Sequence, residues 1–189
     1  RFQLAPNDER HRHLFKVLRV APGDTVRIGV VDGPLGRGVV ESVDASGTSI
    51  RAEWLHDPFP SLPIDVVLGH PRPPVLRRVW RDLAALRVRS IRIFAGDLGE
   101  RSYLGSNAWR GVEARLREGL SQGRHTARPA VYRYDALDHL FDEAPPVRYR
   151  YYGAIDTRDG EPFDRAVATV ATATEASVAI CIGPERGLR

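Results

Sequence analysis

The sequence of 189 residues predicts an α/β protein in two parts, a small β-barrel or sandwich followed by a larger domain built on a parallel sheet. Alternating apolar and polar segments fill the first part. Three prolines then crowd into DPFPSLP at 57–63, and beyond them continuous apolar runs alternate with stretches of helical spacing. We therefore expect domains at 1–58 and 64–189, joined by a linker at 59–63.

The first domain is expected to be mostly β-strand. A short basic helix is predicted at 7–19, and segments in which apolar and polar residues alternate follow at 25–31, 37–43 and 48–55. Asp32-Gly33 and Ser46-Gly47 separate these segments and are typical of hairpin turns. Short strands joined by tight turns favour a small barrel or sandwich.

The second domain begins with a strand-helix-strand unit. IDVVLGH at 64–70 and SIRIFAG at 90–96 are the expected strands. Between them, VLRRVWRDLAALRV at 75–88 has helical spacing, and its packing side is expected to consist of Val75, Val79, Leu83 and Leu86. Strands that alternate with helices predict a parallel sheet with both faces covered.

The same alternation continues toward the end of the chain. Ser106 is expected to cap a helix that runs through Trp109, Val112, Leu116 and Leu120. Further strands are predicted at 129–134, 150–156 and 177–183, with helices at 135–142 and 161–174.

Composition favours a nucleic-acid partner. Lys16 is the sole lysine among 28 basic residues, so the net charge of +4 and the pI of about 9.6 come almost wholly from arginine. Guanidinium groups grip phosphates with two hydrogen bonds and stack on bases. No apolar run approaches the ~18 residues that a membrane helix needs, and we find no signal peptide. We therefore expect a cytoplasmic protein that does not bind a membrane.

Several kinds of chemistry lack their motifs. There is no GxGxxG after a strand, no P-loop, no HExxH and no paired CxxC, which leaves nucleotide-dependent redox, phosphoryl-transfer and zinc chemistry without support. The histidines do not group at metal-ligand spacing, so no metal site is expected. Cys181, the single cysteine, lies in an apolar strand and is expected to act as a small buried hydrophobe.

Three loops are placed where parallel sheets bind ligands, after the carboxyl ends of strands. They are 69–72, 96–102 and 183–187. Their glycines allow the backbone to approach a ligand closely, and Pro184 stiffens the turn that carries Glu185. A turn this short is also compatible with an ordinary exit from a strand.

A basic helix end is a further candidate. Glu118 and Gln122 lie four residues apart on one helix face, and Arg124, His125 and Arg128 follow as the helix ends. The pattern places amide and guanidinium groups together near the next strand. It is equally compatible with an exposed helix end that carries favourable cations.

Four of these features resemble one family in the same order. They are the stretch from His13 to Asp24, the GERS element at 99–102, the Glu-x3-Gln helix with its basic end before Pro129, and IGPERG at 182–187. Together they resemble the RsmE-type 16S ribosomal RNA uridine-N3 methyltransferases over nearly the whole chain. One difference is Arg186, which stands where family members commonly have a glycine.

The resemblance implies a fold, a cofactor and partners. It implies an N-terminal PUA-like RNA-binding barrel and a SPOUT-type α/β domain that ends in a trefoil knot. It also implies S-adenosylmethionine as methyl donor, a homodimer, and a uridine of 16S ribosomal RNA in the small ribosomal subunit as target. Because the family continues past the IGPERG-like loop with a knot-forming segment, we expect that segment to be missing from this chain and the second domain to be incomplete at its C-terminal end.

The resemblance also implies site residues. The cofactor would be bound by Gly153, Ile182, Gly183, Pro184, Glu185, Gly187 and Leu188. RNA would be bound by Arg10, Arg12, His13, Lys16, Arg19, Arg124 and Arg128. Methyl transfer to N3 of uracil requires loss of the N3 proton and stabilisation of the negative charge that spreads onto O2 and O4. Arg101 is the first candidate to stabilise that charge and Arg72 the second, while Glu185 or a water would take the proton.

Two other interpretations stay open at this point. The chain could be a non-catalytic RNA-binding protein on a methyltransferase-like scaffold. It could also be a SPOUT methyltransferase that acts on transfer RNA or another ribosomal position, because a fold does not choose its substrate.

Overall fold

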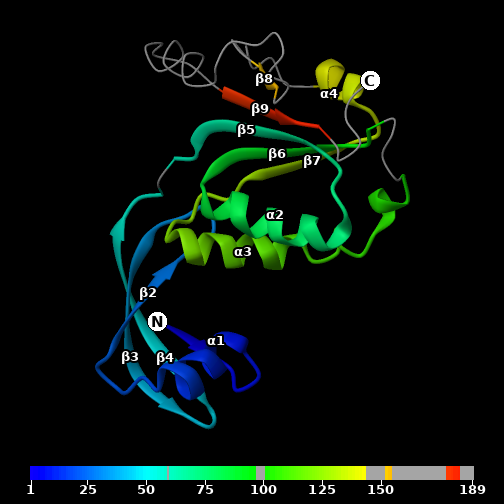
Figure 1. Cartoon of the computed structure of the whole chain (residues 1–189). Coiled ribbons are helices and arrows are strands. Elements are labelled where there is room, and N and C mark those ends of the chain that lie inside the picture. The colour runs from blue at the N-terminus through cyan, green and yellow to red at the C-terminus, as the bar shows by residue number, and fades with distance from the viewer. Residues whose placement is uncertain (59, 97–100, 144–151, 155–177, 184–189) are drawn as a thin grey trace. The chain divides into compact units, whose positions relative to one another are not determined.

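The computed structural model describes residues 1–58, 60–96, 101–143, 152–154 and 178–183. The chain divides into two compact units, Arg1–Phe59 and Pro60–Arg189. Figure 1 shows the elements of each unit in sequence colours. Among the described residues, no helix is both long and apolar enough to cross a membrane.

The first unit contains a four-stranded antiparallel sheet in the order β1-β4-β3-β2. Its strands are β1 (Phe2–Leu4), β2 (Thr25–Gly29), β3 (Leu35–Asp44) and β4 (Gly47–His56), which confirms the three strands expected after residue 24. The expected helix is shorter than 7–19 and changes geometry, with an α-helical turn α1 (Glu9–Arg12) that continues as the π-helical turn η1 (His13–Leu18). Leu4, Leu14 and Ile50 form the core of this unit.

Gly47 shows why the second hairpin is tight. Its φ of 148° lies in a region that side chains rarely adopt. A Cβ at this position would also lie 2.5 Å from the carbonyl oxygen of Leu4 in β1. Only glycine therefore allows β1 to run beside the start of β4.

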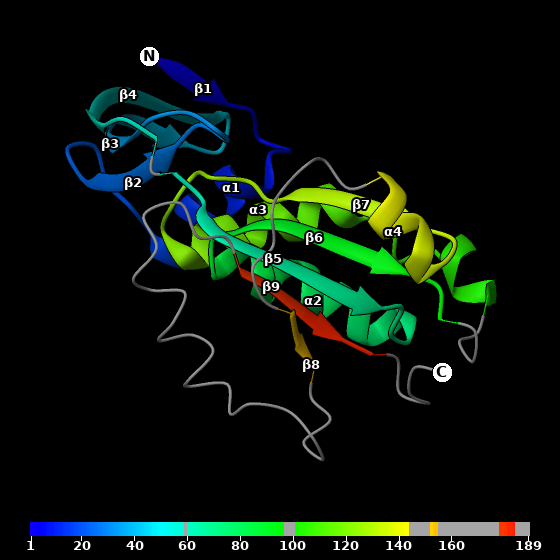
Figure 2. The ribbon, with the colours of Figure 1, turned by 90° about the horizontal axis from the view of Figure 1, so that it is seen from above.

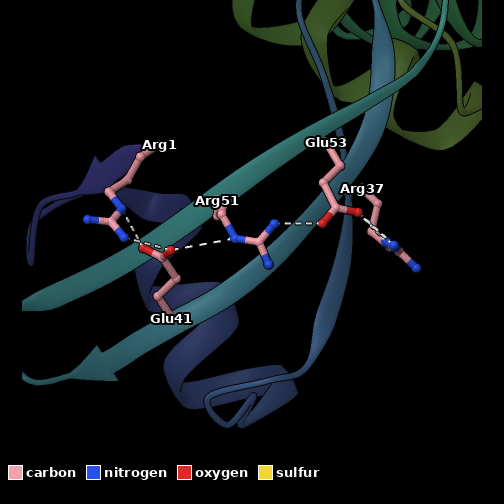
Figure 3. A network of polar contacts seen from close by, with 5 residues as sticks. All are labelled: Arg1, Arg37, Glu41, Arg51 and Glu53. Carbon is pink, nitrogen blue, oxygen red and sulfur yellow. Dashed lines mark hydrogen bonds and ion pairs between the residues drawn. The ribbon is translucent and has the colours of Figure 1, made fainter.

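A row of alternating charges crosses the sheet of the first unit (Figure 3). Arg1 and Arg51 contact Glu41 at 2.7 and 3.7 Å, and Arg51 and Arg37 contact Glu53 at 2.7 and 2.6 Å. These residues are partly exposed to solvent, so each pair adds little stability. The contacts fix three guanidinium groups in defined positions along the strands.

The second unit contains a five-stranded sheet in the order β7-β6-β5-β9-β8, and every strand pair in it is parallel. Its strands are β5 (Leu62–Gly69), β6 (Val88–Phe94), β7 (Ala130–Tyr134), β8 (Tyr152–Ala154) and β9 (Val178–Ile182). Figure 2 shows β7, β6, β5 and β9 side by side. The predicted α/β class with a parallel sheet is confirmed.

Two helices cover one face of this sheet. They are α2 (Pro73–Ala85) and α3 (Val112–Gly123), which lie next to each other in Figure 1. Gly119 of α3 lets them approach closely, because a Cβ there would lie 2.2 Å from the carbonyl oxygen of Arg81 in α2. The other face is covered near its carboxyl edge by α4 (Leu137–Glu143), whose Leu140 packs with Val67 and Phe94.

The predicted packing side of α2 is partly wrong. The fully buried side chains are Leu76, Trp80 and Ala84, whereas Leu86 is 63% exposed because the helix ends one residue before it. Val88, expected at the end of the helix, opens β6 instead. The left-handed conformation of Arg87, with φ of 59°, turns the chain between the two elements.

The predicted start of α3 is also wrong. Ser106 does not cap the helix, which begins at Val112 with Gly111 at its N-cap. A 3-10 turn, η2 (Arg101–Gly105), and further turns occupy the stretch before it. Trp109 therefore lies outside the helix, and this changes what its indole can contact.

Candidate functional site at the carboxyl edge of the parallel sheet

The strand order places a topological switch point between β5 and β9. The chain proceeds from β5 to β6 and β7 on one side, while β9 and β8 lie on the other side of β5. Leu68 of β5 pairs with Ile182 of β9, so Gly69 and Gly183 come next on neighbouring strands. Open α/β sheets bind ligands at such a point, since the loops separate there and leave a crevice.

The loop after β5 leads directly into α2. Arg72 occupies the N-cap position and Pro73 and Pro74 follow, whose fixed φ angles suit the first turn of a helix. Arg72 is exposed and three residues beyond the end of β5. The structure thus places this predicted catalytic candidate at the carboxyl edge, in the loop that follows β5, the strand next to β9.

His70 is buried at the same edge, and its hydrogen bonds define its protonation state. Its Nδ1 lies 2.8 Å from the carbonyl oxygen of Pro71, which can only accept, so Nδ1 carries the proton. Its Nε2 then accepts a hydrogen bond of 3.0 Å from Nε1 of Trp109. Burial lowers the pKa of His70, and the positive charge of Arg133 lowers it further, so the ring is held neutral.

Side chains around His70 hold η2 in place. The ring centroids of Tyr103 and His70 are 5.9 Å apart, and Arg133 of β7 donates to the carbonyl oxygen of Leu104 at 3.3 Å. The Arg133 guanidinium also lies 5.7 Å from the centre of the Trp109 ring. Arg101 is the first residue of η2, and its side chain lies outside the described part of the structure.

The structure describes three of the predicted cofactor residues. Gly153 lies in β8 and pairs with Ile180, Ile182 ends β9 and is 38% exposed, and Gly183 follows it directly. Ile182 and Gly183 are thus at the switch point, whereas Gly153 lies further back along the sheet. Pro184, Glu185, Gly187 and Leu188 lie outside the described residues.

Five predicted RNA-binding residues come together on the first unit. All five are exposed on α1, on η1 or directly after η1: Arg10, Arg12, His13, Lys16 and Arg19. Arg10 donates to Asp8 at 2.7 Å, which lowers the pKa of that carboxyl to about 2. Buried His11 and Leu14 anchor the segment, and His11 contacts the Thr48 hydroxyl at 2.8 Å.

The other two predicted RNA-binding residues lie on the second unit. Arg124 is exposed and ends α3 in the left-handed conformation, with φ of 57°. Arg128 is exposed and its guanidinium lies 2.9 Å from the carboxylate of Glu113. His125, between them, is instead buried and bonded to the carbonyl oxygen of Ala84 at 2.9 Å, so it links α3 to α2.

A buried polar row on the sheet was missed by sequence reasoning. Asp65 of β5 accepts from Arg89 and Ser90 of β6, and Arg92 donates to Tyr134 at 2.8 Å. Burial opposes ionisation of Asp65, but hydrogen bonds from Arg89 and Ser90 outweigh it and lower the pKa. The alternation of Ser90 and Arg92 with apolar residues in β6 is the signal that could have revealed this row.

Cys181 lies in β9 and is only partly buried. Burial nevertheless raises the pKa of its thiol, which keeps it protonated. This agrees with a packing role.

Comparison with known proteins settles the family. The family model described as an RNA methyltransferase domain matches residues 58–189, which is the larger part of the chain. The chain belongs to the RNA methyltransferase domain family. Two curated proteins are similar to this family member. Ribosomal RNA small subunit methyltransferase E from Treponema pallidum (strain Nichols) is 29% identical over 131 residues. Ribosomal RNA small subunit methyltransferase E 1 from Borreliella burgdorferi is 26% identical over 130 residues. The resemblance to RsmE-type enzymes is thereby confirmed.

The matches differ in how much they cover. Each curated relative is matched over 68% of this chain but over only 49% and 55% of its own length, so the chain spans about half of them. Among solved structures, a methyltransferase from Legionella pneumophila in complex with S-adenosylmethionine has a TM-score of 0.73 at 16% identity, covering all of this chain and 76% of that one. Ribosomal RNA small subunit methyltransferase E from Neisseria gonorrhoeae, bound to the same cofactor, has a TM-score of 0.69 at 16% identity, with 100% and 75% covered. At these identities the structures show a shared fold.

Proposed function

We propose that the chain is an S-adenosylmethionine-dependent methyltransferase that methylates N3 of a uridine in 16S ribosomal RNA. The observation that supports it most is the pairing of Leu68 with Ile182, which sets Gly69 and Gly183 side by side at the topological switch point of the parallel sheet. This sheet lies in the part of the chain that matches the RNA methyltransferase family. Two solved structures of the same fold were determined with S-adenosylmethionine bound.

The residues at the edge fit such a cofactor. Gly69 and Gly183 have no side chain that would keep a ligand away from the main chain, and Ile182, which is 38% exposed, offers an apolar surface to a flat base. Arg72 at the start of α2 suits a carboxylate or the reacting uracil. When bound, the cofactor supplies an electrophilic methyl group on a sulfonium.

The chain's own residues have three tasks in this mechanism. They must hold the uracil N3 in line with the methyl group, stabilise charge on O2 and O4, and accept the N3 proton. We assign charge stabilisation to Arg101, with Arg72 as second candidate, and proton acceptance to Glu185 or a water. Gly153, Pro184, Gly187 and Leu188 complete the proposed cofactor site.

The first unit is proposed to bind the RNA. A PUA-like barrel that presents Arg12, His13 and Lys16 would hold ribosomal RNA, with Arg124 and Arg128 adding contacts from the second unit. We further propose a homodimer that acts in the cytoplasm during assembly of the small ribosomal subunit, and a knotted segment that completes the SPOUT domain.

Binding and transfer can be measured separately. We expect isothermal titration to show binding of S-adenosylmethionine to the chain, and radiolabelled cofactor to deliver methyl to N3 of a uridine in 16S ribosomal RNA. Absence of cofactor binding would favour the non-catalytic RNA-binding alternative. Methylation of transfer RNA alone would favour a different substrate within the same fold.

The role of Arg101 makes a sharper prediction. Arg101→Ala should lower kcat by about 10²–10³-fold, the usual cost of losing a donor that stabilises developing negative charge, while cofactor affinity stays within twofold. Arg115→Ala is the matched control, because it removes the same charge from the exposed side of α3, where Arg115 contacts Glu118. Unchanged turnover in Arg101→Ala would refute the assignment.

A further inference from the structure

Trp109 donates a side-chain hydrogen bond to His70, whereas Trp80, which packs against Trp109, donates none to a described residue. Trp80 and Trp109 lie with their ring centroids 5.2 Å apart, yet only the indole of Trp109 has its N–H satisfied by a described residue. The acceptor is Nε2 of His70, in the loop that β5 delivers to the carboxyl edge. The contact therefore links two segments 39 residues apart in the chain.

The segment that contains Trp109 is the one that follows η2. The amide of Ser106 donates to the carbonyl oxygen of Tyr103 at 3.0 Å, and the amide of Trp109 donates to Ser106 at 3.2 Å. These hydrogen bonds join residues within the segment and not the segment to the sheet, so its position on the sheet depends on side-chain contacts. Tyr103, Leu104 and Trp109 provide three such contacts, with His70 and Arg133 as their partners.

We propose that His70 and Trp109 are positioning residues, whose hydrogen bond fixes η2 at the carboxyl end of β5 and so holds Arg101 at the reacting uracil. The catalytic part of this proposal rests on the proposed function. In this proposal His70 does not touch the substrate and acts through Trp109 and, by ring contact, through Tyr103. Arg133 supports the same arrangement from β7, because it contacts both the Trp109 ring and the Leu104 carbonyl.

The hydrogen bond can be removed without removing the ring. Trp109→Phe keeps an aromatic side chain but has no N–H, and His70→Ala removes the acceptor. His70→Gln supplies an amide oxygen at a similar reach and should restore the contact, since a primary amide accepts through its oxygen. Trp80→Phe is the matched control, because Trp80 loses comparable volume but no hydrogen bond to a described residue.

Amide hydrogen exchange tests the position of η2 without any methyl transfer. We expect the amides of Ser106 and Trp109 to exchange about tenfold faster in Trp109→Phe and His70→Ala, the effect of roughly 1.4 kcal/mol in local opening. His70→Gln and Trp80→Phe should stay near the wild-type rates at these amides. Unchanged exchange in Trp109→Phe, or equal acceleration in Trp80→Phe, would overturn the proposal.

Kinetics test the catalytic part. We expect Trp109→Phe to lower kcat about tenfold with KM for S-adenosylmethionine within twofold, and His70→Gln to recover most of the loss seen in His70→Ala. Faster exchange with unchanged kcat would overturn the catalytic role. A wild-type chain that transfers no methyl group would refute the proposed function instead, and the exchange experiment would still decide how η2 is held.

Discussion

At the scale of single residues, His70 combines burial with a fixed tautomer. Protonation would place a second N–H on Nε2, facing the N–H of Trp109, and would set a positive charge near Arg133. Tyr103 of η2 lies against the ring, and the positive charge of Arg133 in β7 acts on it. Both the lost acceptor and the added charge disfavour the imidazolium.

This makes stability depend on pH in a defined direction. The pKa of His70 in the folded chain lies below its ordinary value of 6.5, so between these two values the unfolded chain binds more protons. The stabilising contribution of neutral His70 is therefore complete above pH 6.5 and is lost as the pH falls toward the folded pKa. We expect the free energy of unfolding, from urea titrations, to decline more steeply over this interval in wild type than in His70→Gln.

The comparison of the two proteins isolates His70. Other titrating groups contribute equally to both curves, so the difference between them reports this side chain. A constant difference across the interval would show that His70 is not held neutral by the fold.

The sequence could show some of these residues but not their contacts. Loop 69–72 was predicted as part of a site from its place after a strand, and the structure puts it at the switch point. The partner of His70 could not be predicted, because Trp109 was assigned to a helix and lies 39 residues away. Arg92 was read as part of an apolar strand, since nothing local reveals that Tyr134 of β7 will accept from it.

At the scale of elements, α2 shows where periodicity helps and where it fails. Helical spacing correctly predicted a helix between two parallel strands, but it centred the packing side on the wrong residues. The helix packs on the sheet and also on α3, so the apolar stripe along it is wide. The centre of this stripe is formed by Leu76, Trp80 and Ala84, and Val79 and Leu83 lie at its margin. A wide stripe does not define its own centre.

The corrected packing side can be tested with one type of substitution. Leu76→Ala should lower the free energy of unfolding by about 2–5 kcal/mol, because Leu76 is fully buried and its removal leaves a cavity. Leu86→Ala, at a position that is 63% exposed, should change it by no more than about 0.5 kcal/mol. Equal effects in chemical denaturation would restore the packing side that the sequence predicted.

At the scale of the whole molecule, the chain has a net charge of +4, but its basic side chains are not equally available to bind RNA. The guanidinium groups of Arg37 and Arg51 are held by Glu53, as Figure 3 shows. Arg12 and Lys16 form no ion pair with another described residue and lie four positions apart on neighbouring helical turns. Charges that are not neutralised within the protein are the ones that can displace counterions from RNA.

The salt dependence of RNA binding should therefore show which of two basic surfaces of the first unit contacts RNA, the α1 and η1 segment or the charged row of the sheet. For a single-stranded RNA oligonucleotide, the slope of log K against log salt should be smaller in magnitude by about 1.4 in the double variant Arg12→Ala/Lys16→Ala, because each of the two lost phosphate contacts removes about 0.7. Fluorescence anisotropy between about 50 and 200 mM salt gives this slope.

Arg37→Ala/Arg51→Ala removes the same charge from the sheet and is the matched control. We expect its slope to stay closer to that of wild type, since these guanidinium groups are already paired with a carboxylate. If the control loses as much slope as the first variant, the charged row of the sheet binds the RNA and the assignment to α1 and η1 is wrong.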